Sequence, residues 1–212
     1  MHNRLYLTVF GAMVGALLAT AAPASAQVEL TGVVGGLLGG DLDNILAGNA
    51  SVKGAFDNGP VYGVRLGWVG GFFGFEGSFV GSPSGVAISI PNRPVDLGGK
   101  VYYAEANALL IPIPGPISPF FTVGAGWHSY TFDLEAGNQQ SDQVTLEKTG
   151  WNIGGGLKIN IKALTLRGDV RDHITRVGPT DFNVGDIETD LGITEEATLH
   201  NVEISAGIGI RF

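Results

Sequence analysis

The chain has 212 residues, 44% of them hydrophobic and 15% charged, and a formal net charge of −8 at pH 7. This acidic balance disfavours nucleic acid as a partner because phosphates would repel the chain, and the absence of cysteine excludes a disulfide scaffold and a thiolate metal site. After residue 26 no stretch approaches the ~18 unbroken apolar residues of a spanning helix. The high apolar content therefore indicates alternating β-strands, within a length that suits one domain.

The N-terminus has the features of a secretory signal peptide. A basic start, Met1–Arg4, precedes an apolar run over Leu5–Ala19, and Ala24-Ser25-Ala26 forms an A-x-A cleavage motif. We therefore expect residues 1–26 to be cleaved and residues 27–212 to form a barrel domain with eleven basic and twenty acidic residues. The alternative is an uncleaved N-terminal membrane anchor.

Eight segments alternate apolar with polar or small residues at a period of two, which predicts β-strands. The first, Val28–Leu37, alternates poorly because Val33 and Leu37 fall on its polar face. The other seven are clearer and run, in chain order, over Tyr62–Trp68, Phe73–Phe79, Tyr102–Leu110, Phe121–His128, Trp151–Ile161, Leu164–Arg171 and Asn201–Phe212. Since successive side chains of a strand point to opposite sides, each strand has one apolar face and one polar or small face.

The polar face of these strands carries five acids and five bases, which are Glu29, Arg65, Glu76, Glu105, Lys158, Arg167, Asp169, Arg171, Glu203 and Arg211. Such a balanced set suits a paired network in a narrow lumen, because buried charges persist only when they are paired. Glycines on the same face leave room in the small volume that eight strands enclose. The apolar face would then meet lipid. The alternative is a soluble, lipocalin-like barrel with the apolar face as its core.

Connections between the strands alternate in length. The short ones lie near Val69–Gly71, Pro112–Ser118 and Lys162–Ala163, and the long ones near Gly39–Gly59, Gly81–Gly99, Asp133–Glu147 and Arg176–Ala197. Outer-membrane barrels have short periplasmic turns and long extracellular loops. This topology places aromatic side chains at the two membrane interfaces, and the candidates are Tyr62, Trp68, Phe73, Phe79, Tyr102, Phe121 and Trp151.

Three segments, Pro119–Gly126, Leu166–Arg171 and Ile208–Phe212, resemble the small OmpA/OmpW-like outer-membrane β-barrel superfamily. The resemblance implies an all-β, eight-stranded antiparallel transmembrane barrel of up-and-down topology in the bacterial outer membrane. It also implies that Phe212 serves as a signal for the barrel-assembly machinery. The family includes structural anchors, adhesins, narrow channels and lipid-modifying enzymes, so the fold does not settle the function.

His128-Ser129 is the first candidate for catalysis, in a lipid A hydrolase. Neighbouring residues of a strand point to opposite faces, so these two side chains cannot easily pair, and the His-x-Ser-Asn arrangement of the family's deacylases is missing. We therefore expect no catalytic residue. His128 and His173 are expected to form hydrogen bonds in the lumen or at its rim.

Two acidic stretches are candidates for cation binding: Asp41-Leu42-Asp43-Asn44, and the group Asp181, Asp186, Glu188, Asp190, Glu195 and Glu196. Neither has the further oxygens and closing Glu of a calcium loop, so both are read as solvated loops. A looser hypothesis is that divalent ions bridge them to anionic lipopolysaccharide. Gly35–Gly40 lacks the Lys-Ser/Thr of a phosphate loop and is read as a flexible strand end.

The sequence thus predicts a monomeric structural or surface-interaction barrel without cofactor or dedicated metal site. Its partners would be outer-membrane lipid and lipopolysaccharide. The rivals are a narrow channel for small or apolar solutes, with transport that depends on Arg167 or Glu105, and a lipid A-modifying enzyme.

Overall fold

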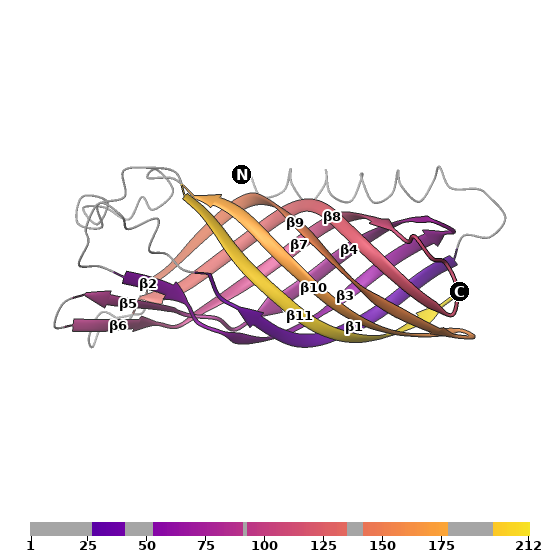
Figure 1. The fold of residues 1–212 in the computed structure, drawn as a ribbon. Helices are drawn as coiled ribbons and strands as arrows, with labels where there is room; N and C mark the ends of the chain where they lie inside the picture. The colour runs from indigo at the N-terminus through magenta and orange to yellow at the C-terminus, as the bar shows by residue number, and fades with distance from the viewer. Residues whose placement is uncertain (1–26, 41–52, 91–92, 135–141, 178–196) are drawn as a thin grey trace.

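Eight antiparallel strands close into a barrel in the part of the chain that the computed structural model describes, which is residues 27–40, 53–90, 93–134, 142–177 and 197–212. The barrel strands are β1 (Gln27–Leu38), β3 (Gly59–Gly70), β4 (Phe73–Ser82), β7 (Gly99–Leu110), β8 (Ile117–Leu134), β9 (Asp142–Ile161), β10 (Leu164–Val177) and β11 (Ala197–Arg211). Each pairs with its neighbour along the chain, and β1 closes the barrel by pairing with both β3 and β11 (Figure 1). The predicted fold class is confirmed. No helix in the described ranges is long and apolar enough to cross a membrane.

The short connections all lie at one end of the barrel, called here the short-turn end. β3 and β4 are joined through Gly71 and Phe72, and β9 and β10 through Lys162 and Ala163. Gly71 has φ +67°, a left-handed conformation that glycine adopts without strain. The carboxyl end of β11 lies at the same end of the barrel (Figure 1).

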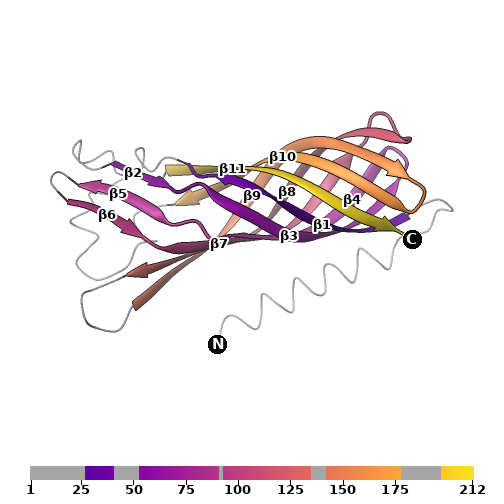
Figure 2. The same ribbon diagram turned by 90° about the horizontal axis from the view of Figure 1, so that it is seen from below.

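A second, smaller sheet lies at the opposite end, called here the long-loop end (Figures 1 and 2). It has the order β2-β5-β6, formed by β2 (Lys53–Phe56), β5 (Val86–Ile90) and β6 (Arg93–Leu97). The long connections predicted near Gly39–Gly59 and Gly81–Gly99 therefore contain short strands of their own. These strands escaped sequence analysis because they are short and because β2 pairs with a segment about thirty residues further along the chain.

The third predicted long connection, Asp133–Glu147, is strand in both of its described parts, 133–134 and 142–147. β8 continues to Leu134, which pairs with Asp142 at the start of β9. Backbone hydrogen bonds of a ladder do not require an apolar face, so this hairpin extends beyond the segment in which side chains alternate.

The outer surface of the barrel is apolar, as the alternation predicted. Large exposed side chains include Val34, Val123, Ile153, Val170 and Ile208. The seven predicted interface aromatics also point outward, at two levels. Near the short-turn end Trp68 stacks on Phe75, and near the long-loop end Phe79 stacks on Tyr102, each pair with ring centroids 6.1 Å apart.

The lumen is filled in three layers. At the short-turn end Leu109, Ile111 and Phe120 form a small apolar cluster, and a polar layer follows it. At the long-loop end lies a larger apolar cluster made of Val33, Leu37, Phe56, Val61, Val80, Val101, Tyr103, Tyr130, Leu146, Val177 and Leu199. This cluster explains the poor alternation of β1, because two of its apolar side chains, Val33 and Leu37, face inward to join it.

Candidate functional site

The polar layer of the lumen contains nine of the ten charged residues predicted there. Each of the nine is at most 4% exposed: Glu29, Arg65, Glu76, Glu105, Lys158, Arg167, Asp169, Arg171 and Glu203. They come from β1, β3, β4, β7, β9, β10 and β11, so the network ties most of the barrel wall together. The tenth, Arg211, lies half-buried at the short-turn rim.

Arg211 is separate because it lies at the end of β11, where the lumen opens. Its guanidinium donates to Gln27 Oε1 (3.0 Å) and to the backbone oxygen of Lys162 (2.8 Å), rather than to a lumen carboxylate. Phe212, the predicted assembly signal, follows it and is 74% exposed.

The network begins near the short-turn end with the pair Lys158 and Glu29. Lys158 Nζ lies 2.8 Å from Glu29 Oε1, and Thr165 donates to the other oxygen of the carboxylate at 3.3 Å. The cationic groups of Lys158 and Arg167 lie 5.6 Å and 4.9 Å from the centre of the Phe120 ring. This aromatic contact joins the charged layer to the apolar cluster beneath it.

At the centre, two carboxylates hold three arginines. Glu76 accepts from Arg167 at 2.6 Å and from Arg171 at 2.7 Å. Asp169 receives two bonds from Arg167, both at 2.7 Å, and lies 2.7 Å from Arg65 Nη1. Such two-pronged, charge-assisted contacts are strong and fix the relative positions of the side chains.

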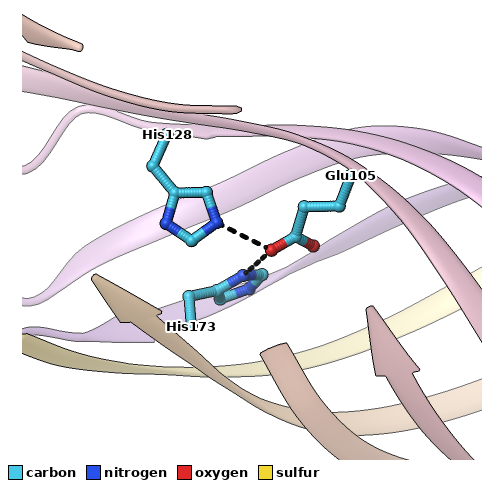
Figure 3. Close-up of side chains that lie close together, drawn as sticks. All are labelled: Glu105, His128 and His173. Carbon is cyan, nitrogen blue, oxygen red and sulfur yellow. Dashed lines mark hydrogen bonds and ion pairs between the residues drawn. The ribbon is translucent and has the colours of Figure 1, made fainter. Parts of the chain in front are cut away.

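Towards the long-loop end, Glu105, His128 and His173 point towards one another from β7, β8 and β10 (Figure 3). Glu105 Oε1 lies 3.0 Å from His128 Nε2 and 2.9 Å from His173 Nδ1. The far nitrogen of His128 lies 2.6 Å from Thr175 Oγ1, and that of His173 lies 3.1 Å from Glu203 Oε2. In the described part of the chain, only these three residues form a His, Cys, Asp or Glu group whose ligand atoms all lie within 4.8 Å of one another.

Hydrogen bonding determines where the protons of this cluster lie. Both ring nitrogens of His173 face carboxylate oxygens, and an ionised carboxylate only accepts. With Glu105 and Glu203 both ionised, both nitrogens would donate and His173 would be an imidazolium. Its charge would then bring the buried cations to five, equal to the five buried carboxylates of the lumen.

Aromatic packing holds the two imidazoles in place. The Tyr103 ring stacks on His173 with centroids 4.0 Å apart and planes 2° apart, and it meets His128 edge-on at 4.7 Å. Gly150 leaves the space that the His128 ring occupies, since a Cβ atom there would collide with the ring. Strand alternation predicts that both histidines point inward, but it gives no sign that they meet Glu105.

A cavity of about 390 Å³ opens at the short-turn end. Glu29, Lys158, Lys162 and Arg211 are among its lining residues. It reaches the Glu29–Lys158 pair, where the charged layer begins. The acidic stretches at 41–44 and 181–196 lie outside the described residues.

No family model matches the chain, and no curated protein matches it either. Several solved structures do. Neisserial surface protein A matches with a TM-score of 0.56 and 11% identity, over 89% of this chain and 100% of that one. The chain has the fold of the small outer-membrane β-barrels. A major outer membrane protein from Thermus thermophilus gives a TM-score of 0.53 at 13% identity, over 89% of this chain and 100% of that one.

A third match is Ail, the attachment invasion locus protein of Yersinia pestis, in complex with the heparin analogue sucrose octasulfate. Its TM-score is 0.50 at 18% identity, over 88% of this chain and 98% of that one. At such low sequence identities the similarity shows the fold alone, and the function of this barrel depends on its own residues.

Proposed function

We propose that the chain is a monomeric outer-membrane barrel with a closed lumen and a structural or surface-interaction role. The observation that carries the proposal is the filled lumen, in which nine buried charges lie between two apolar clusters. An eight-stranded barrel has an interior that side chains just fill, and here ion pairs span it from β1 to β11.

The proposed location rests on the reversed polarity of the wall. A soluble, lipocalin-like barrel would keep its apolar faces inside, whereas here they surround the outside and the charges are inside. Monomeric proteins in water rarely expose apolar patches larger than a few hundred Å², so lipid is the natural surrounding. The signal peptide over residues 1–26 lies outside the described residues and stays a prediction, as do contacts with lipopolysaccharide and the barrel-assembly machinery.

Planar bilayer recording tests the closed lumen. Purified protein should give no sustained conductance above that of the empty bilayer, because the buried Arg167–Glu76 and Lys158–Glu29 pairs occupy the lumen. A steady, ohmic current from the unmodified protein would contradict the proposal.

A narrow channel is the second candidate, and the cavity of about 390 Å³ at the short-turn end favours it. Solute entering there would meet the Glu29–Lys158 pair and then Arg167. Release of small solutes from liposomes by the unmodified protein, changed by Arg167→Gln or Glu105→Gln, would establish this candidate in place of the first.

The surface role rests on the β2-β5-β6 sheet and the β8–β9 hairpin, which extend the long-loop end. Ail, a barrel of the same fold, has been captured with a polyanion. This chain has a net charge of −8, so we expect a partner other than a polyanion. Sucrose octasulfate should show no saturable binding in a titration that detects its binding to Ail, and measurable affinity would contradict this expectation.

The acidic stretch at 181–196 offers a separate test at the cell surface. If divalent ions bridge it to lipopolysaccharide, replacing its Asp and Glu residues by Asn and Gln should alter the EDTA sensitivity of the outer membrane. Unchanged sensitivity would rule out the bridging hypothesis without affecting the closed lumen.

A further inference from the structure

We propose that Glu105, His128 and His173 form a binding site for one divalent transition-metal ion of the zinc class, inside the barrel below the apolar cluster of the long-loop end. The three side chains come from β7, β8 and β10 and converge on one point (Figure 3). Their nearest ligand atoms, Glu105 Oε1, His128 Nε2 and His173 Nδ1, lie within 4.8 Å of one another.

The donor set suits zinc. Two imidazole nitrogens and one carboxylate oxygen are ligands that Zn²⁺ takes at ~2.0–2.2 Å, with a fourth position open to water. In a tetrahedron of such bonds the ligand atoms stand about 3.3 Å apart. The contacts of Glu105 with the two histidines are 3.0 Å and 2.9 Å, so each needs to open by only a few tenths of an ångström.

Hydrogen bonds to the far nitrogens hold both rings in ligating orientations. His173 Nε2 faces Glu203 Oε2 at 3.1 Å, and Glu203 is itself held by Arg65 and Ser205. His128 Nδ1 faces Thr175 Oγ1 at 2.6 Å, and Thr175 contacts the hydroxyl of Tyr130 at 2.7 Å. Metal-binding histidines nearly always have such a partner on the second nitrogen, which fixes the tautomer and the ring.

The proton balance of binding is simple. The ion displaces the proton on His173 Nδ1, which leaves the protein, while Nε2 keeps its bond to Glu203. In the free barrel His128 donates from Nε2 to Glu105, so on binding it changes to the tautomer protonated on Nδ1, which donates to Thr175 and leaves Nε2 for the metal. Binding therefore replaces one proton by a divalent cation, which raises the net charge of the lumen by one. The added positive charge lies beside the carboxylates of Glu105 and Glu203.

Burial determines how the site must be loaded. All three ligands are at most 1% exposed, so the ion enters while the barrel folds. The mature chain should be refolded in detergent with and without ZnCl₂, passed over a desalting column, and analysed for zinc by mass spectrometry. We expect one ion per chain, and a Co²⁺-loaded sample should show the absorption of a tetrahedral site.

Variants separate a built site from incidental binding. Glu105→Gln and His173→Gln should each lose the stoichiometric zinc, whereas Glu203→Gln should weaken binding by about 10–100-fold as a positioning residue. The matched control is His200→Gln, because His200 is 54% exposed and pairs with Asp172 at 2.7 Å, away from the cluster. It should retain one zinc per chain.

A heat-modifiability gel on every sample shows whether the barrel has folded. If Glu105→Gln or His173→Gln does not fold, His128→Asn is used in its place. The proposal is overturned if the folded, unmodified protein holds no more zinc than folded His173→Gln. It is equally overturned if His200→Gln removes the ion. Because this site does not depend on whether the lumen conducts, the bilayer and zinc results can be read separately.

Discussion

At the scale of single residues, Glu76 is the carboxylate shared by two arginines at the centre of the lumen. Its two oxygens face Arg167 at 2.6 Å and Arg171 at 2.7 Å, and all three side chains are excluded from solvent. Removing one partner of a buried ion pair leaves an uncompensated charge, which costs more than the pair itself contributes. Much of the barrel's sensitivity to substitution should therefore concentrate in the lumen.

Glu76→Gln should lower the free energy of unfolding by about 3–5 kcal/mol, because two buried guanidinium groups lose their common counter-charge. Urea titration in lipid vesicles, followed by tryptophan fluorescence, measures the change. The matched control is Asp172→Asn, which removes the partly exposed pair with His200 and should cost at most about 1 kcal/mol. Equal losses in both variants would contradict the buried network.

At the scale of strands, small residues on the inner face decide whether β8, β9 and β10 can approach. A Cβ atom on Gly156, which faces inward on β9, would collide with the carbonyl oxygen of Gly168 and lie 2.8 Å from the Phe120 ring. Gly168 on β10 points the other way, and a Cβ atom there would meet nothing within 4 Å. The two positions hold the same residue type in opposite environments, which gives a matched pair for substitution.

Gly156→Ala should destabilise the barrel by about 1–3 kcal/mol, because Phe120 and the cations above it must move. Gly168→Ala should leave stability unchanged or raise it by about 0.5 kcal/mol. The midpoint of urea unfolding in vesicles measures both. The assignment of inner and outer faces would be wrong if Gly168→Ala were the more damaging change.

At the scale of the whole molecule, the apolar outer wall implies a bilayer around the barrel. Val170 lies midway along the apolar part of β10 and is 51% exposed, and Ile161 lies at the short-turn end of β9. In a bilayer these positions differ in depth, whereas in water they would be equivalent.

Val170→Arg should cost about 2–4 kcal/mol in vesicles, since it places a charge at the membrane midplane, while Ile161→Arg should cost at most about 1 kcal/mol near the interface. The fraction of folded protein at each urea concentration, read from a heat-modifiability gel, gives both values. Equal tolerance of the two arginines would show that the wall does not face lipid.

The direction in which the side chains of each barrel strand point could be predicted from the sequence. Alternation at a period of two is a local property, because the pleat sends neighbouring side chains to opposite sides. It was enough to predict the eight barrel strands, the short turns, the apolar outer wall, and the inward position of the charges and of His128 and His173. It did not identify β2, β5 and β6, which are only four or five residues long, or the full length of the β8–β9 hairpin.

Which inward side chains meet depends on how the strands are assembled into the barrel. Glu29 and Lys158 are 129 residues apart in the chain, Arg65 and Glu203 are 138 apart, and Glu105 and His173 are 68 apart. Their contacts depend on barrel closure through β1 and β11 and on the relative register of all eight strands, which no local pattern contains. The position of an inward residue along the barrel axis determines its neighbours in the lumen. For this reason Arg211, at the short-turn rim, lies apart from the network, whereas Val33 and Leu37 lie in the apolar cluster.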